Sequence, residues 1–155
     1  MNPLVYADAA YMVHIPALLS RSGMIIFMCG GCIIAKSQRQ KLVTASSTEA
    51  ELVAMAEATK YALALRHFLQ AQSHELKPVV IYQDNRSVLD MLAAGRPLHA
   101  RSKHIHMRYF IAVQHIISKE ITVVWCPTEE MCADVLTKAL DTSLYIVMRD
   151  WMLNR

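Results

Sequence analysis

The sequence lacks the features that mark membrane, secreted and disulfide-rich proteins. It contains no apolar run that approaches the length of a transmembrane helix, about 20 residues. The first residues, MNPLVYADAA, include no basic segment followed by an apolar stretch, so we expect no secretory signal. Four cysteines in 155 residues are too few for a disulfide scaffold and favour a reduced, intracellular protein.

Internal repeats, low-complexity tracts and recognisable linkers are also missing. The chain of 155 residues is long enough to bury one core but short for two domains. With 54% apolar and 19% charged residues, the composition is that of a globular protein and not of a disordered one. The formal net charge of +3 permits a nucleic-acid partner but does not by itself indicate one.

The pattern of apolar residues and breakers predicts an α/β protein. The predicted elements are a strand at 4–9, a hairpin over 24–38 that turns at Gly30-Gly31, a helix at 47–70, a strand at 79–84, helices at 85–95 and 101–118, a strand at 121–125, a helix from Pro127-Thr128 through 140, and a further helix or polyprotein joint over 141–155. A hairpin followed by alternating strands and helices indicates a mixed sheet flanked by helices.

Two glutamates stand two residues apart at the start of the longest predicted helix, in the segment ASSTEAEL. The capping-box pattern, Ser or Thr followed three residues later by Glu, occurs twice, as Ser46 with Glu49 and as Thr48 with Glu51, and it requires no catalysis. At about 100° per residue, however, Glu51 lies in line with the apolar stripe that contains Met55, whereas Glu49 falls on the other side. A buried charge without a partner is costly, so Glu51 needs a basic partner, a proton or a metal ion.

Three aspartates occupy comparable settings. Asp8 and Asp84 lie at the ends of predicted strands, where ligands bind in open α/β sheets, although Asp84 could instead cap the next helix. Asp134 has apolar neighbours, but it could equally be a surface residue supported by Lys138 four residues later. Carboxylate oxygens are hard ligands that suit Mg²⁺ or Mn²⁺. Periodicity alone does not predict that the four acids converge.

In order along the chain, six motifs resemble the ribonuclease H domain of a copia-type LTR retrotransposon reverse transcriptase. The motifs are VYADA (5–9), Arg21-Ser22-Gly23, AKSQRQKLVTASSTEAEL (35–52), YQDNRS (82–87), RSKHI (101–105) and CPTEEMCADVLTKAL (126–140). Each motif is weak alone, but six in the right order are specific. The resemblance covers about residues 4 to 140.

The resemblance implies a ribonuclease H-like fold, with a five-stranded mixed sheet flanked by α-helices, over residues 1–140. The last segment, 141–155, would be a helical tail or a polyprotein joint. The family's four acidic metal ligands fall on Asp8, Glu51, Asp84 and Asp134, which would hold two Mg²⁺ ions, with Mn²⁺ as an alternative. The implied reaction is hydrolysis of the RNA strand of an RNA·DNA hybrid, which leaves a 3′-hydroxyl and a 5′-phosphate.

The resemblance also assigns substrate contacts. Short polar side chains beside the acids would reach the 2′-hydroxyl that distinguishes RNA from DNA, and a basic helix would face the phosphates. The residues concerned are Ser46, Ser47, Thr48 and Asn85 for the RNA, and Arg101, Lys103, His104 and Arg108 for the phosphates. The basic run could also be an ordinary solvated face. The resemblance also implies the polymerase domain of the same polyprotein as a partner, and no membrane partner is expected. The implied location is the virus-like particle of the element in the cytoplasm.

The sequence departs from the family at three points, one of them the segment VHIPALLSRS, which lacks the polar, charged character usual there, and other interpretations stay open. Ala10 stands where the family often has a second aspartate, and the loop WCPTEE lacks the histidine that assists cellular ribonucleases H. The main alternative is a catalytically silent module that binds hybrid or packs on the polymerase. A metal or redox site at CGGC (29–32) is less favoured, because this segment is expected at the tip of a hairpin, whereas redox sites of this type precede a helix. An integrase-like nuclease is also less favoured, because integrases normally use three acids.

Overall fold

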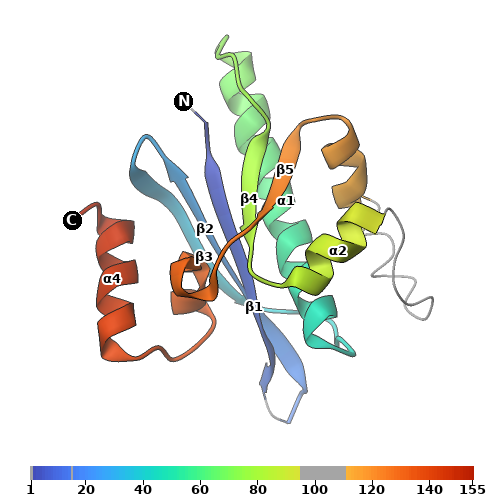
Figure 1. Ribbon diagram of the computed structural model, residues 1–155, viewed down its shortest axis with the longest axis vertical. Helices are drawn as coiled ribbons and strands as arrows, with labels where there is room; N and C mark the ends of the chain where they lie inside the picture. Colours follow the sequence, from blue (N-terminus) through green and yellow to red (C-terminus); the bar gives the residue numbers. More distant parts are fainter. Residues whose placement is uncertain (1, 15, 95–110) are drawn as a thin grey trace.

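The computed structural model describes residues 2–14, 16–94 and 111–155. Five strands form one sheet in the order β3-β2-β1-β4-β5 (Figure 1). The strands are β1 (Leu4–His14), β2 (Leu19–Met28), β3 (Gly31–Arg39), β4 (Val79–Gln83) and β5 (Ile121–Trp125). Because β1 pairs with β2 antiparallel and with β4 parallel, the predicted mixed sheet is confirmed, and its first strand is longer than predicted.

The β2–β3 hairpin turns one residue earlier than predicted. Met28 pairs with Gly31, so the two turn residues are Cys29 and Gly30, and Gly31 already belongs to β3. Both turn residues have positive φ angles, 53° and 83°. This combination matches the twist of antiparallel strands joined by two residues, and here a cysteine adopts the left-handed backbone at the first position and a glycine at the second.

Helix α1 (Ser47–Ala71) begins at the first of the two possible capping boxes. The Ser46 hydroxyl accepts a hydrogen bond from the Glu49 backbone N–H at 3.2 Å, and the Glu49 carboxylate accepts one from the Ala45 N–H at 2.7 Å. Glu49 therefore takes part in the helix cap, and the same helix start points Glu51 toward the interior.

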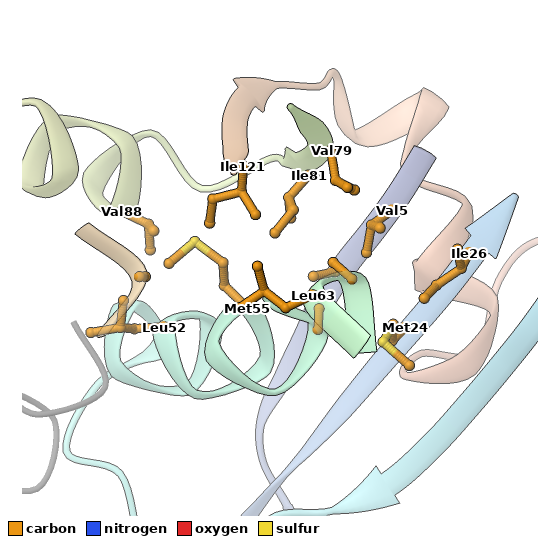
Figure 2. Packing of buried hydrophobic residues seen from close by; sticks show 14 of the residues in the cluster. Val5, Met24, Ile26, Leu52, Met55, Leu63, Val79, Ile81, Val88 and Ile121 are labelled. Carbon is orange, nitrogen blue, oxygen red and sulfur yellow. The ribbon is translucent and has the colours of Figure 1, made fainter. Parts of the chain in front are cut away.

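The main core lies between α1 and one face of the sheet (Figure 2). Val5 and Ile81 from neighbouring parallel strands and Leu52 and Met55 of α1 belong to this core, and all four side chains are fully buried. Each such side chain contributes roughly 1.5–3 kcal/mol on burial. Because side chains alternate along a strand, the burial of Val5 on this face places Asp8 on the other.

The segment after β5 is not the continuous helix that the sequence predicts. It forms two short 3₁₀ turns, η1 (Thr128–Glu130) and η2 (Cys132–Leu136), separated by Met131, whose ψ angle of 83° is incompatible with a helix. Met131 is fully buried in a second core cluster with Cys126 and Ala133, on which the stacked rings of Tyr6 and Tyr82 pack. Burial of Met131 in this cluster therefore overrides the helical pattern.

The remaining helices agree with the prediction as far as they are described. Helix α2 (Arg86–Ala94) follows β4, residues 111–117 are helical, and α4 (Thr142–Leu153) occupies the C-terminal segment. The first part of the helix predicted at 101–118 lies outside the described residues. Within the described ranges, the helices are too short or too polar to cross a bilayer.

Candidate active site

Three aspartates that are distant in the sequence meet at one end of the sheet. Asp8 lies in β1 and Asp84 directly follows β4, and the parallel pairing of Tyr6 with Tyr82 brings both acids to the same level. Asp134 in η2 supplies the third carboxylate. One oxygen from each of the three groups lies within 4.8 Å of the other two. The cluster therefore lies at the carboxyl end of β4, where ligands bind in open α/β sheets.

Gly23 of β2 allows η2 to lie close enough for Asp134 to reach this cluster. Gly23 is the antiparallel partner of Asp8. A Cβ atom at Gly23 would lie 2.7 Å from the Thr137 side chain and 2.8 Å from the Ala133 carbonyl oxygen. The contact is possible only without a side chain, so this glycine is required by a close approach and not by its backbone angles.

Glu51 is the fourth carboxylate, and it is buried in α1. Its side chain is 6% exposed, and its Oε2 atom has no hydrogen-bond partner among the described residues. Burial raises the pKa of Glu51 well above its usual range, and the charges of Asp8 and Asp84 raise it further. The prediction that Glu51, and not Glu49, points into the protein is confirmed.

Asp134 and Asp84 show the same kind of pKa perturbation. Burial, followed by the charge of Asp8, raises the pKa of Asp134 to about 6 despite the opposing effect of Lys138. Burial and Asp8 also raise the pKa of Asp84, whose carboxylate accepts a hydrogen bond from the Thr128 hydroxyl at 3.3 Å. Clustered acids with raised pKa values are typical of functional sites.

Lys138 and Thr137 complete the site, and sequence reasoning did not assign them to it. The Lys138 ammonium donates hydrogen bonds to Asp8 Oδ1 at 3.2 Å and to Asp134 Oδ1 at 2.9 Å, and the Thr137 hydroxyl donates to Asp8 Oδ2. Burial lowers the pKa of Lys138, but Asp8 and Asp134 raise it more, so the net shift is upward. The i, i+4 spacing signalled the contact with Asp134, although Asp134 is buried and not on the surface.

Two of the predicted RNA contacts have side chains that also cap helices. Ser46 caps α1, and the Asn85 side-chain oxygen accepts from the Val88 N–H at 3.3 Å at the start of α2. Asn85, and not Asp84, therefore supplies the cap that leaves Asp84 in the acid cluster. Ser47 is exposed and Thr48 half-buried. The other predicted contacts, Arg101, Lys103, His104 and Arg108, lie outside the described residues.

The donor set fits hard divalent cations. The four groups offer carboxylate oxygens, which Mg²⁺ and Mn²⁺ prefer. A bound cation would also compensate the buried Glu51 Oε2 atom, which has no hydrogen-bond partner among the described residues. The alternative site at CGGC has no such support. All four cysteines are free thiols, with Cys29 exposed in the hairpin turn and Cys32 paired with Phe27 in the sheet.

Comparison with known proteins identifies relatives over most of the chain. Residues 8–139 match the family described as reverse transcriptase-like. A retrovirus-related Pol polyprotein from a transposon of Nicotiana tabacum is 33% identical over 145 residues, which are 94% of this chain and 11% of the relative. Another from Arabidopsis thaliana is 32% identical over 136 residues, 87% of this chain and 9% of the relative.

Solved structures with the same fold are ribonucleases H. The LC11 ribonuclease H1, isolated from compost, superimposes with a TM-score of 0.63 at 16% identity, over 88% of this chain and 92% of that one. Its complex with an RNA/DNA hybrid gives a TM-score of 0.57 at 16% identity, over 88% and 94% of the two chains. At such low identity the likeness shows the fold alone.

The chain spans about a tenth of the length of the curated relatives that it matches. Those relatives are Pol polyproteins of transposons, and the family match covers every one of the four clustered acids. The chain therefore belongs to the reverse transcriptase-like family and carries the ribonuclease H fold.

Proposed function

We propose that this chain is a ribonuclease H that hydrolyses the RNA strand of RNA·DNA hybrids during reverse transcription of a retrotransposon. The observation that carries the proposal is the meeting of four carboxylates from β1, α1, the end of β4 and η2, on the fold of known ribonucleases H. Three of these acids, Glu51, Asp84 and Asp134, have raised pKa values, and such a cluster destabilises a protein unless cations bind it, so a catalytic role is the best account of the site.

Asp8, Glu51, Asp84 and Asp134 would hold two Mg²⁺ ions, or Mn²⁺. Bound metal would activate the attacking water and stabilise the leaving 3′ oxygen. In the metal-free site the chain's own residues orient the ligands: Thr137 and Lys138 donate hydrogen bonds to Asp8, and Thr128 donates one to Asp84. Preorganised ligands of this kind need little rearrangement when the charge of the reaction develops.

The hybrid as substrate is supported by the complex of the compost ribonuclease H1 with an RNA/DNA hybrid. The hydroxyl of Ser46 accepts a cap hydrogen bond, but its O–H group is still available to donate to a ribose 2′-hydroxyl. The amide group of Asn85 can do the same beside Asp84. Ser47 and Thr48 follow on the same helix start, and Arg101, Lys103, His104 and Arg108 would contact the phosphates.

The test is cleavage of an end-labelled RNA·DNA hybrid by the purified protein with Mg²⁺ and then with Mn²⁺. Only the RNA strand of the hybrid is expected to be cut, with no cutting of duplex DNA or duplex RNA. Asp84→Asn should lower the rate by at least about a hundredfold, because an amide replaces a charged ligand. The matched control is Asp90→Asn, which changes an exposed aspartate of α2 and should leave the rate unchanged.

Other outcomes separate the alternative from the proposal. Binding of the hybrid without cutting, even when the polymerase domain is added, would support the catalytically silent module. Equal rates for Asp84→Asn and the unchanged protein would contradict the assignment of the acids. Cutting that needs the polymerase domain would retain the reaction and locate part of the substrate grip outside this chain.

We further propose that the polymerase domain of the same polyprotein is a partner, in the virus-like particle in the cytoplasm. Support comes from the Pol polyprotein relatives and from α4, in which Tyr145, Val147 and Trp151 are 45%, 50% and 46% exposed. Large exposed apolar side chains that cluster on one element are typical of interaction surfaces. The division into a domain at 1–140 and a tail at 141–155 is part of this proposal, with the tail as the docking element.

Replacing Tyr145 and Trp151 together with glutamate should weaken binding of the purified polymerase domain by at least about tenfold, because both anchors lose apolar contact. Isothermal titration calorimetry measures the affinity. Phe68→Glu is the matched control, since Phe68 is 58% exposed on α1. Equal losses in both proteins would contradict a specific role for α4.

A further inference from the structure

One side chain places a positive charge inside the acid cluster. The Lys138 ammonium lies 3.2 Å from Asp8 Oδ1 and 2.9 Å from Asp134 Oδ1 and so bridges acids from β1 and η2. Both acids are almost completely buried, at 0% and 2% exposure, whereas the lysine side chain is 37% exposed. The charge therefore enters the cluster from its solvent side on a flexible four-carbon stem.

A metal ion bound to these two acids would need the place that the ammonium occupies. Mg²⁺ binds carboxylate oxygens at about 2.0–2.1 Å, which is closer than the ammonium lies to either oxygen. An ion that contacted both Asp8 Oδ1 and Asp134 Oδ1 would stand between them, beside the lysine nitrogen. A monovalent and a divalent cation cannot share this space, because their repulsion is strong at contact distance.

We infer that Lys138 is a resident cation of the metal-free site, displaced into solvent when a metal ion binds Asp8 and Asp134. The inference rests on the proposed metal binding of these same acids. It makes Lys138 a positioning residue with two consequences. In the absence of metal it holds Asp8 and Asp134 together against their repulsion, and during loading it competes with the metal and raises the concentration needed to fill the site.

The first test compares Lys138→Met with Lys138→Arg in the full chain. Isothermal titration with Mg²⁺ alone is expected to show binding on the order of tenfold tighter in Lys138→Met, because the competing charge is gone. Without metal, in EDTA, Lys138→Met should melt at a lower temperature than the unchanged protein, and Mg²⁺ should raise its melting temperature by more. Lys138→Arg keeps the charge and should bind Mg²⁺ nearly as the unchanged protein does.

A second test uses the unchanged protein and so does not depend on the folding of a variant. Reductive methylation followed by mass spectrometry reports how accessible each lysine amine is. Adding Mg²⁺ should increase the labelling of Lys138 several-fold as it leaves the acids. Lys36 is the internal control, since its side chain is 31% exposed and its ammonium donates to the Tyr61 hydroxyl at 2.7 Å, away from the acid cluster.

The outcomes distinguish this inference from the proposed function. Mg²⁺ binding of equal strength in Lys138→Met and the unchanged protein, or labelling of Lys138 that does not rise, would overturn the displacement and leave the nuclease proposal standing. No Mg²⁺ binding to either protein would overturn both. Tighter binding in Lys138→Met with increased labelling in the unchanged protein would establish the lysine as the competing cation.

Discussion

Replacing Glu51 with glutamine is expected to stabilise the metal-free protein and to lower hydrolysis of hybrid by at least about a thousandfold. Glu51 is buried beside Asp8 and Asp84, and its Oε2 atom has no hydrogen-bond partner among the described residues. A neutral amide of the same shape removes this unfavourable charge, a gain of about 2 kcal/mol, which corresponds to about 4–8 °C in melting temperature. The same change removes a charged metal ligand, so activity falls while stability rises.

The raised pKa values also predict how the stability of the metal-free protein changes with pH. The folded protein holds protons on Glu51 and Asp134 more tightly than the unfolded chain does, because burial raises both pKa values. The usual pKa values are 4.5 for Glu51 and 3.8 for Asp134, and the folded protein raises both, that of Asp134 to about 6. At pH values between the usual and the raised pKa of each group, the folded state binds more protons than the unfolded chain does. The metal-free protein should therefore lose stability as the pH rises through this window, and less steeply in Glu51→Gln.

Thermal unfolding in EDTA from pH 4 to 8, with hybrid cleavage in Mg²⁺, measures both effects. Glu49→Gln is the matched control, two residues earlier on the same helix. A glutamine at that position still offers an oxygen to the Ala45 N–H, so stability and activity should change little. A lower melting temperature for Glu51→Gln in EDTA would show that the Glu51 charge is already compensated in the metal-free protein.

Replacing Gly23 with alanine is expected to damage the site from a distance. The new Cβ atom would meet the Ala133 carbonyl oxygen at 2.8 Å, and this backbone atom cannot move without η2. Crowding of a packed interior typically costs about 1–3 kcal/mol. Because η2 carries Asp134, the shift also moves a metal ligand, and a displacement of about 1 Å can lower activity about a hundredfold.

The control for this change is Gly31→Ala, because a Cβ at Gly31 meets no atom within 4 Å. Urea unfolding and hybrid cleavage of the two variants, measured side by side, separate the crowding at η2 from the general effect of losing a glycine in a strand. Full activity of Gly23→Ala, with unchanged stability, would mean that η2 shifts without cost and that its place on β2 does not position Asp134.

Local patterns in the sequence predicted the elements and the choice between the two glutamates. Helical periodicity alone separated Glu51 from Glu49, because a helix start fixes the direction of every later side chain. The convergence of Asp8, Asp84 and Asp134 came only from the family resemblance, since it depends on which strands are neighbours. That information lies in the pairing of β1 with β4 and not in the spacing of residues.

The errors came from tertiary contacts. The helix predicted after Pro127 does not form, because Met131 is buried in the cluster with Cys126 and Ala133, and the segment divides there into two short turns. The hairpin shifted by one residue because Cys29 accepts a left-handed backbone that the pattern reserved for glycine. Lys138 appeared only as a surface partner of Asp134, because its second contact, with Asp8, spans most of the chain.

The hydrogen bond from Thr137 to Asp8 joins residues 129 positions apart, and it has a consequence for protein synthesis. The central strand β1 is translated before the other strands of the sheet, and η2, which closes the acid cluster over it, is translated more than a hundred residues later. Contacts of such long range form late in folding. A nascent chain therefore carries an incomplete acid cluster until translation has passed η2, the last segment that contributes a carboxylate to it.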